Sequence, residues 1–374
     1  MITTMNPPAI KPEHELVLEL SQFRNRNREK IVELLSRKLD LAEILGHLTY
    51  NRTAGIAYHV LRQIEAPSFN REFEMALYLI HQIQSLRTSA HKKHISQLAK
   101  AMNESGIPHA FLKGAILANS VYPEGCRISS DIDILLNAGH LTECSNIFKS
   151  LGFIQGFHDE NKNEVIPATR KELINYRMNF GEVVPFRKVI DEPGINLIEI
   201  DINFSLNWLP HGTEEAVENF ILQAQMYDFP DGQQVSSLPP EYFLAHLCVH
   251  LFKEAHVITW VEWQRDLGLY KFVDLYGFLT DSALQIDWNG FIRIVRDNDI
   301  VKESFYALEY ARTFFPVLND NRAFIEALEQ IKPDNTDYLE QVIDGGDASI
   351  VYRWTKGLLP RFFDMHRYDS LERV

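Results

Sequence analysis

The sequence predicts an α+β fold in which a sheet-forming segment lies between two helical regions. Apolar residues recur at helical spacing over residues 13–66. Apolar and acidic residues then alternate in "DIDILL" (131–136) and in "IEIDINF" (198–204), which is the two-residue period of a strand. Beyond Pro239 the apolar positions return to helical spacing. Helices are therefore expected at both ends and strands between them.

Length and composition indicate a globular protein with more than one core. A chain of 374 residues exceeds one comfortable hydrophobic core, and we expect a helical region over 1–70, a sheet-containing domain over 71–235 and a helical domain over 236–374. No apolar run approaches the roughly 20 residues of a membrane helix. The first residues resemble neither a signal nor a transit peptide. We expect a cytoplasmic protein without membrane association.

Charge and cysteine content exclude several classes of function. The formal net charge of −14 opposes binding to long nucleic acids or anionic lipid, because phosphates attract proteins with a positive surplus. A local basic cluster can still bind a triphosphate. Cys126, Cys144 and Cys248 are too few and too scattered for a disulfide framework or a thiolate zinc site, and they are expected to be packing residues.

The first strand follows a long helical segment. Residues 71–105 predict one long helix or two joined helices that end at Gly106, a C-cap glycine with Pro108 just beyond it. The short apolar run "HAFLKGAIL" comes next and predicts a buried strand that ends at Lys113-Gly114. "AILANSVY" is expected to form a helix before the second strand.

The later elements follow from the same two periods. "RISSDIDILL" predicts a strand with Asp131 and Asp133 on one face, and "NLIEIDINFSL" a strand with Glu199, Asp201 and Asn203 on one face. "LTECSNIFKSLGF" predicts a helix between them, and "PPEYFLAHLCVHLFKEA" a helix that begins with prolines.

The two aspartates form a candidate metal site. Their side chains leave the strand about 7 Å apart on the same side, close enough to bind one hard cation such as Mg²⁺. Two like charges in an apolar strand cost several kcal/mol unless a cation compensates them. A third carboxylate from "IEIDINF" would complete a site for two ions. The alternative is a strand end where both acids face water; a calcium loop does not fit, because its sixth position requires a glycine.

These motifs together carry a family resemblance. The run "GIPHAFLKGAILANSVYPEGCRISSDIDILL", followed by "IEIDINFSL", resembles the uncharacterised nucleotidyltransferase family of the DNA polymerase beta-like superfamily. The resemblance spans roughly residues 75–270, since "PPEYFLAHLCVHLFKEAHVITWVEWQRDLGLY" also resembles the family's helical segment. It implies a small mixed sheet of the polymerase beta-like nucleotidyltransferase type, with helical N-terminal and C-terminal regions.

The resemblance also implies a set of site residues. Asp131 and Asp133 are the implied metal ligands and Asp201 the implied third acid, with Glu199 as the fallback; two Mg²⁺ ions and an NTP donor are implied with them. Asn203 stands where the family usually has histidine, which puts in question the polar contact that the histidine makes. The residues expected to contact the nucleotide are Lys113, Gly114, Ala115, Arg127 and Ser130. Ala115 replaces the superfamily's usual serine, so the backbone and Lys113 would have to bind more of the phosphate.

The predicted function is magnesium-dependent nucleotidyl transfer. A nucleoside monophosphate would move from an NTP to a hydroxyl of a small molecule, peptide or protein, and Asp201 would help to deprotonate that hydroxyl. One alternative is a nucleotide-sugar glycosyltransferase that uses Asp-x-Asp, which leaves Lys113-Gly114 and the third acid unexplained. The other is a nucleotide-binding or regulatory protein without turnover, which the changes at Ala115 and Asn203 favour.

Further residues have two interpretations each. His246 and His250 are four apart on one helix, which permits a metal pair, but no glutamate follows the first histidine and hydrogen-bonded histidines are expected instead. The family resemblance places this helix beside the sheet, where His250 would line the cleft. Asp266 either positions substrate or pairs with Arg265 or a nearby lysine. The tryptophans and phenylalanines of residues 260–278 are expected in the core.

Overall fold

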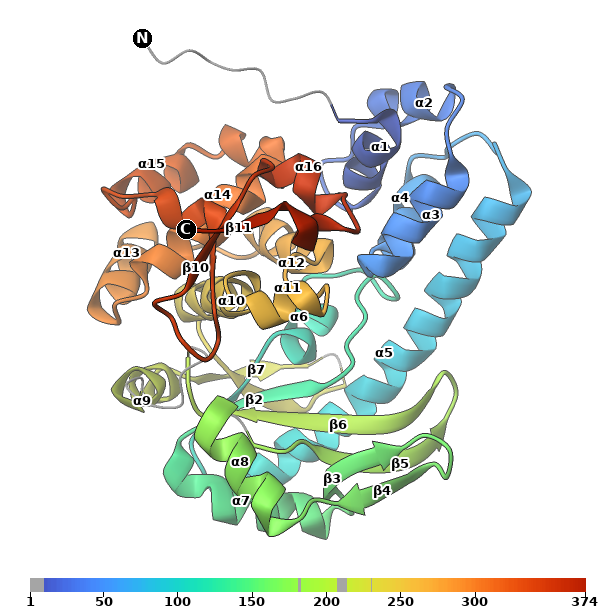
Figure 1. The fold of residues 1–374 in the computed structure, drawn as a ribbon. Coiled ribbons are helices and arrows are strands. Elements are labelled where there is room, and N and C mark those ends of the chain that lie inside the picture. The colour runs from blue at the N-terminus through green and yellow to red at the C-terminus, as the bar shows by residue number, and fades with distance from the viewer. Residues whose placement is uncertain (1–9, 181–182, 207–213, 230) are drawn as a thin grey trace. The chain divides into compact units, whose positions relative to one another are not determined.

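The structure is a computed structural model that describes residues 10–180, 183–206, 214–229 and 231–374. The described residues form two compact units (Figure 1). The first unit comprises residues 1–81, 251–280 and 301–374, and the second comprises residues 82–250 and 281–300. Each unit joins segments that are distant in the sequence, so the predicted division at residues 70 and 235 stays a prediction.

The first unit begins with four short helices, coloured in shades of blue in Figure 1. They are α1 (Pro12–Leu20), α2 (Arg28–Leu35), α3 (Leu41–Tyr50) and α4 (Ala54–Gln63). Side chains cap two of them: Asn27 accepts a hydrogen bond from the N–H of Lys30, and Asp40 accepts from the N–H groups of Ala42 and Glu43. Such caps satisfy N–H groups that the helix itself leaves unpaired. The helical spacing predicted for residues 13–66 is confirmed.

The rest of the first unit is helical with one small sheet. Its helices are α11 (Ile258–Glu262), α12 (Leu269–Leu279), α14 (Val301–Phe314), α15 (Arg322–Gln330) and α16 (Leu358–Phe362), with 3₁₀ turns at Pro316–Asp320, Asp337–Glu340 and Arg367–Ser370. The antiparallel strands β9 (Gln341–Ile343), β10 (Val351–Trp354) and β11 (Leu371–Arg373) lie in the order β11-β10-β9. The apolar spacing predicts a mainly helical region beyond Pro239 and does not single out these strands. Strands of three or four residues are too short to show a clear alternation.

Helix α5 (Arg71–Ser105) begins in the first unit and ends in the second. It is one continuous helix, which decides between the two predicted forms. Gly106 follows it with φ +71°, a left-handed conformation that glycine adopts without steric cost. The predicted C-cap is confirmed.

The second unit contains a mixed eight-stranded sheet in the order β4-β3-β5-β6-β2-β1-β8-β7. Strand β2 runs parallel to β6 and β1 parallel to β8, while the other neighbours are antiparallel. The strands are β1 (His109–Phe111), β2 (Ile132–Leu136), β3 (Ile154–Asp159), β4 (Glu164–Pro167), β5 (Phe186–Glu192), β6 (Ile195–Asn203), β7 (Gln225–Asp228) and β8 (Gln234–Ser237). The α+β class and the mixed sheet are confirmed; the polymerase beta-like type stays a prediction.

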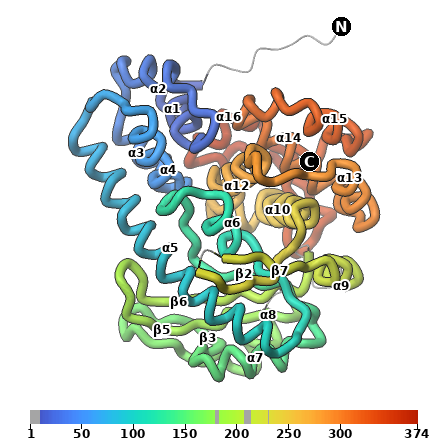
Figure 2. The backbone as a smooth tube through the Cα atoms, turned by 180° about the vertical axis from the view of Figure 1, so that it is seen from behind, coloured from blue at the N-terminus to red at the C-terminus, as the bar shows by residue number. Residues whose placement is uncertain are grey.

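One face of this sheet forms the core of the second unit. The even-numbered residues of β2 and β6, such as Ile134 and Ile200, pack with α7 (Leu141–Ser150) and the second half of α5 (Figure 2). The unit's other helices are α6 (Gly114–Ser120), α8 (Arg170–Phe180), α9 (Glu214–Leu222), α13 (Trp288–Asp297) and the first part of α10 (Pro240–Ala255), with a 3₁₀ turn at Ala138–His140. Strand alternation therefore turns the odd-numbered residues of β2 and β6 to the opposite face.

Across the described ranges, no helix has both the length and the apolar content that a membrane crossing requires.

Candidate functional site

Three of the predicted acids lie on neighbouring strands. Asp133 on β2 is directly opposite Asp201 on the parallel strand β6. Asp131 comes one residue before β2 begins, next to Ile132, which is opposite Ile200. Because the even-numbered residues fill the core, the acids share the other face of the sheet. The structure thus brings together carboxylates that are about 70 residues apart in the sequence.

Asp133 is held by two donors. The Nζ atom of Lys113 donates a hydrogen bond to its Oδ1 at 2.6 Å, and the Nδ2 atom of Asn203 donates to the same oxygen at 3.3 Å. Asp133 is 4% exposed, so this ion pair is buried. Asn203, the departure from the family pattern, therefore supplies a polar contact to the acid. Lys113, predicted to contact phosphate, contacts a carboxylate in this structure.

The backbone explains why Lys113 reaches Asp133. The N–H of Leu112 donates to the carbonyl oxygen of Asp133 at 3.0 Å, which continues the β1–β2 pairing and leaves Lys113 next to the acids. Lys113 then has φ +43° and ψ −118°, a conformation that residues with a Cβ rarely adopt. Such strain costs about 1–3 kcal/mol and gathers at functional sites. The chain accepts this cost where the lysine meets the acids.

The surroundings shift the pKa values of the two aspartates in opposite directions. Burial, followed by the charge of Asp133, raises the pKa of Asp131 to about 6, and Glu199 adds to this effect. Burial acts in the same direction on Asp133, but the Lys113 ammonium and the nearby His250 and His246 outweigh it and lower the pKa of Asp133. The pair therefore holds one firmly ionised carboxylate beside one that ionises reluctantly, as expected for like charges that lack full compensation.

Glu199 is already engaged by an arginine. The Nε atom of Arg187 on the adjacent strand β5 forms an ion pair with the Glu199 carboxylate, and the same guanidinium donates to the carbonyl oxygen of Gly156. Arg187 is directly opposite Glu199 in the antiparallel register. This pairing, together with the register that sets Asp201 opposite Asp133, favours Asp201 over Glu199 as the third acid.

The predicted nucleotide-contact residues surround the start of α6. A Cβ atom on Gly114 would overlap the side chains of Arg127 and Ser129, so the turn requires glycine. Arg127 is buried, and its Nη1 donates to Ser129 Oγ at 2.8 Å. The N–H of Ala115 donates to the carbonyl oxygen of Leu112. Ser130, the last of the predicted set, is exposed immediately before Asp131.

Ser129 was not predicted as a site residue. Its position between Gly114 and Arg127 depends on a turn that folds residues 127–129 back onto α6, and no local pattern in the sequence signals this contact. Arg127 is anchored from a second element as well, because Thr88 Oγ1 on α5 donates to its carbonyl oxygen at 3.3 Å.

Two histidines of α10 lie near the acids. The rings of His246 and His250 are parallel, with centroids 6.4 Å apart, and both lower the pKa of Asp133. This agrees with the expectation that the helix carrying His250 lies beside the sheet. It also places His246, which the sequence did not link to the acids, in the same neighbourhood.

Asp266 and Trp263 differ from their predictions. Asp266 belongs to the first unit and is fully buried, where both of its carboxylate oxygens accept hydrogen bonds from Arg367 Nε at 3.0 and 3.1 Å. The local pair expected with Arg265 is wrong, because the partner lies 101 residues away. Trp263, expected in the core, is 59% exposed, whereas Phe272 is buried as predicted.

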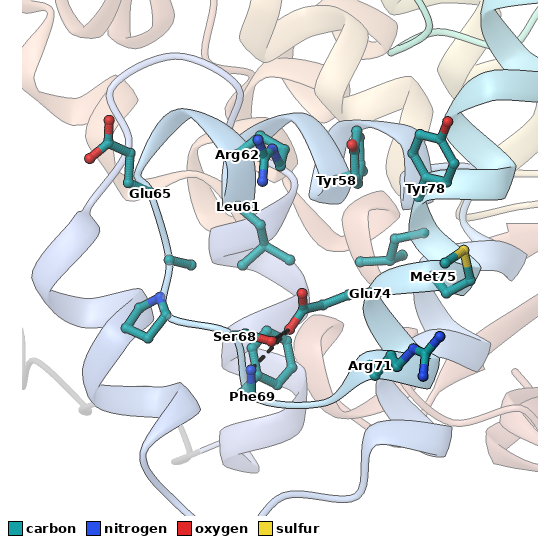
Figure 3. Close-up of a pocket in the computed structure, with 13 residues that line it drawn as sticks. Tyr58, Leu61, Arg62, Glu65, Ser68, Phe69, Arg71, Glu74, Met75 and Tyr78 are labelled. Carbon is teal, nitrogen blue, oxygen red and sulfur yellow. Dashed lines mark hydrogen bonds between the residues drawn. The ribbon is translucent and has the colours of Figure 1, made fainter.

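A separate pocket lies in the first unit. It has a volume of about 530 Å³ and is lined by α4, the loop that follows it and the start of α5 (Figure 3). Arg62 and Arg71 contribute positive charge, and Glu74 closes the loop by accepting hydrogen bonds from Ser68 Oγ and the N–H of Phe69, both at 2.9 Å. None of the predicted acids lines this pocket.

The donor set around Asp133 fits a hard divalent cation. Carboxylate and amide oxygens are the ligands that Mg²⁺ prefers, and Asp131, Asp133 and Asp201 supply carboxylates from two adjacent strands. The Lys113 ammonium now provides the positive charge that Asp133 requires. A cation at the acids would thus share or take over the role of Lys113.

Comparisons with known proteins give a family match and a distant structural match. Residues 37–316, more than half of the chain, match a family described as "Uncharacterised nucleotidyltransferase". Among solved structures, an antigenic nucleotidyltransferase-like protein from Paracoccidioides brasiliensis matches with 16% identity and a TM-score of 0.34, over 65% of this chain and 94% of that chain. At these values the similarity does not establish the polymerase beta-like type. No match to a curated protein reaches significance.

Proposed function

The chain belongs to the uncharacterised nucleotidyltransferase family, and on this premise we propose that it is a magnesium-dependent nucleotidyltransferase. It would transfer a nucleoside monophosphate from an NTP to a hydroxyl of a small molecule, peptide or protein: the hydroxyl oxygen bonds to the α-phosphorus, the α–β phosphoanhydride bond breaks, and pyrophosphate leaves. The observation that carries the proposal is the register that sets Asp133 opposite Asp201, with Asp131 one residue before the same strand begins. A sheet of the polymerase beta-like type is part of the proposal.

Three acids would hold the magnesium. Asp131, Asp133 and Asp201 are the proposed ligands for two Mg²⁺ ions, which when bound would neutralise the triphosphate and lower the cost of charge on the attacking and leaving oxygens. The raised pKa of Asp131 supports this assignment, because a carboxyl group held near a second acid gains most from a nearby cation.

The chain's own residues would position the donor and activate the acceptor. Lys113 would exchange its contact with Asp133 for a phosphate oxygen, as a mobile ammonium can. Arg127, which already donates to Ser129, would orient the turn at Gly114 and Ala115 and offer its guanidinium to the same phosphates. Ser130 would contribute a hydroxyl at the exposed edge. Asp201 would accept the proton of the acceptor hydroxyl.

Transfer of radiolabelled NTP tests this proposal. The full chain is incubated with each α-labelled NTP and Mg²⁺ against the metabolites and proteins of its host, and labelled product is measured for the natural protein, Asp201→Asn and Asp191→Asn. Asp191 is an exposed residue of β5 and serves as the matched control. We expect the Asp201 variant to lose more than about 99% of the transfer, in line with removal of a proton acceptor worth 10²–10⁴-fold. Equal activity in the two variants would refute the assignment of Asp201.

One observation favours a second candidate, a nucleotide-binding regulator without turnover. The Lys113 ammonium already compensates Asp133, which a protein without metal chemistry would retain as a permanent ion pair. Calorimetry with ATP, in the presence and absence of Mg²⁺, separates the two. Binding without transfer to any acceptor would support the regulator, whereas the absence of NTP binding would argue against both.

A further inference from the structure

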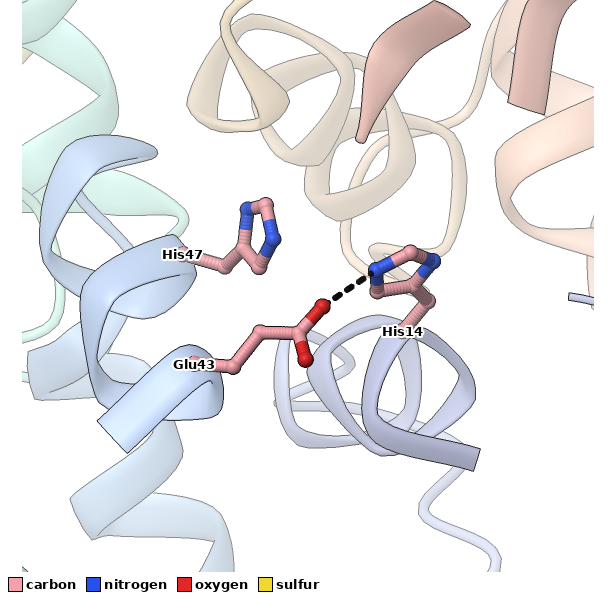
Figure 4. A group of neighbouring side chains, drawn as sticks. All are labelled: His14, Glu43 and His47. Carbon is pink, nitrogen blue, oxygen red and sulfur yellow. Dashed lines mark hydrogen bonds and ion pairs between the residues drawn. The ribbon is translucent and has the colours of Figure 1, made fainter. Parts of the chain in front are cut away.

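A histidine–carboxylate cluster lies in the first unit, on elements that the proposed function does not use. His14 on α1 and Glu43 and His47 on α3 point toward one another (Figure 4). One ligand atom from each residue lies within 4.8 Å of the other two. We propose that His14, Glu43 and His47 form a binding site for a divalent transition-metal ion of the zinc type.

The helices supply the spacing. Glu43 and His47 are four residues apart on α3, which places both side chains on one face of that helix. Helix α1 packs against α3 and presents His14 to that face. The N-cap Asp40 fixes the first turn of α3, immediately before Glu43. Two packed helices therefore hold the three side chains, and no long loop has to become ordered on binding.

An aromatic ring fixes the orientation of both imidazoles. Phe363 stacks on His14 with centroids 4.0 Å apart and an interplanar angle of 6°, and it meets His47 edge-on at 5.2 Å and 86°. His47 is buried, at 7% exposure. Rings held in place before a ligand arrives lose little freedom on binding, which is the general benefit of a preorganised site.

The charge state of the cluster also suits a metal. Burial lowers the pKa of both histidines, so the imidazoles are neutral near pH 7 and can donate a nitrogen lone pair. Burial opposes the ionisation of Glu43, but hydrogen bonds from Lys11 and His14 outweigh it and lower the pKa of that carboxyl. Two neutral imidazoles and one carboxylate are the ligand forms that zinc requires.

The hydrogen-bond partners of Glu43 do not prevent a metal ion from binding. His14 Nε2 and Lys11 Nζ each lie 3.1 Å from Glu43 Oε1. The Lys11 side chain is 62% exposed and can turn to solvent when a cation arrives. Three protein ligands leave a fourth tetrahedral position for water. The nitrogen ligands favour Zn²⁺ over Mg²⁺ or Ca²⁺, which prefer oxygen alone.

Calorimetric titration of the metal-free full chain with Zn²⁺ tests the site. Excess Mg²⁺ is kept present so that the acids of the second unit contribute little. We expect one zinc ion per chain, with affinity at least about tenfold weaker in His14→Gln and in His47→Gln, since even changes around zinc ligands cost 10–100-fold. His140→Gln is the matched control, because His140 is a partly exposed histidine whose Nδ1 lies 3.1 Å from Glu143 Oε2.

Two further measurements keep the test decisive. Glu43→Gln removes the carboxylate charge with little change in shape, and circular dichroism without metal establishes that each variant is folded. Cobalt titration adds a spectroscopic readout, in which visible absorption bands of a four-coordinate ion appear in the natural protein and in His140→Gln alone. Absence of stoichiometric zinc binding, or unchanged affinity in the folded His14, Glu43 and His47 variants, would overturn the proposal without affecting the proposed transferase activity.

Discussion

Asp131 and Asp133 carry the same side chain two positions apart, yet their surroundings shift their pKa values in opposite directions. Lys113 and Asn203 both donate to Asp133 Oδ1, which stabilises the ionised form of that residue. Asp131 is different: burial and the negative charges of Asp133 and Glu199 raise its pKa to about 6. Loss of charge at these two positions should therefore have opposite effects on stability.

Asp131→Asn should stabilise the metal-free protein at pH 7. A carboxyl group whose folded pKa is raised from 3.8 to about 6 adds stability below pH 4, and this contribution is lost as the pH rises through 6. Asparagine never ionises, so the variant should melt a few degrees higher at pH 7–8, at roughly 2–4 °C per kcal/mol. The difference should shrink between pH 6 and pH 4. Thermal melts in EDTA across this range measure it, and a lower melting temperature at pH 7 would contradict the stated environment of Asp131.

Lys113→Met should destabilise the metal-free protein. The variant removes the ammonium from a buried ion pair in which Lys113 and Asp133 side chains are 14% and 5% exposed, and loss of one such partner costs about 3–5 kcal/mol. Mg²⁺ should restore part of this stability, because it would replace the missing positive charge. Chemical unfolding with and without Mg²⁺ measures both effects.

Lys100→Met is the matched control. Lys100 is exposed on α5, and its Nζ atom lies 4.0 Å from Glu104 Oε1. We expect it to change stability by less than about 0.5 kcal/mol. If Mg²⁺ stabilised Lys113→Met no more than the control, the acids would not be the cation site.

At the level of elements, the turn from β1 into α6 contains two constrained residues: Lys113 has a strained backbone conformation, and Gly114 is in close contact with neighbouring side chains. A Cβ at residue 114 would lie 2.9 Å from Ser129 Cβ and closer still to Ser129 Oγ and Arg127 Nη1. Residue 114 therefore has no room for a side chain while Ser129 and Arg127 keep their positions. The register of β2 against β6 then decides which acids face each other.

Gly114→Ala should destabilise the protein by about 1–3 kcal/mol, the usual cost of overpacking. The double variant Gly114→Ala/Ser129→Gly should recover much of that loss, because it removes the Ser129 side chain from the overlap. Gly46→Ala, at a helical glycine with nothing within 4 Å of the added Cβ, is the control and should be neutral or stabilising by up to about 1 kcal/mol. Chemical unfolding of the natural protein and the three variants measures these differences in the free energy of unfolding. If the single and double variants lost the same stability, the contact with Ser129 would not be the cause.

At the level of the whole molecule, buried charges link segments that are far apart in the chain. In the first unit, Arg367 bonds Asp266 across 101 residues, and Arg361 contacts both Glu340 and Tyr310. Arg361 and Arg367 are almost fully buried. Such pairs cost desolvation when they form, but their rupture leaves an uncompensated charge inside the protein.

Asp266→Asn should therefore destabilise the first unit by about 3–5 kcal/mol. Glu326→Gln, which breaks the exposed pair of Arg322 and Glu326 on α15, should cost no more than about 0.5 kcal/mol. Hydrogen exchange of the first unit and chemical unfolding measure the loss. If Asp266→Asn were as stable as the control but bound NTP more weakly, the alternative role of Asp266 in substrate positioning would hold.

Much of the architecture could be predicted from local patterns. The two-residue alternation in "DIDILL" and "IEIDINF" is a property of the extended backbone, so it determined the strands and the shared face of their acids. The helical period determined α1 to α5 and α10 in the same way, and Gly106 marked the end of α5. The family, too, could be identified from the order of these motifs.

Other features depend on partners that no local pattern contains. Only the tertiary structure decided that β2 lies beside β6 in parallel register, that Lys113 meets Asp133, and that Asp266 meets Arg367. The cluster of His14, Glu43 and His47 arises in the same way, from the packing of α1 on α3. Periodicity is set by the geometry of one segment, whereas a contact between distant residues is selected by the packing of the whole core, and so only the folded chain reveals it.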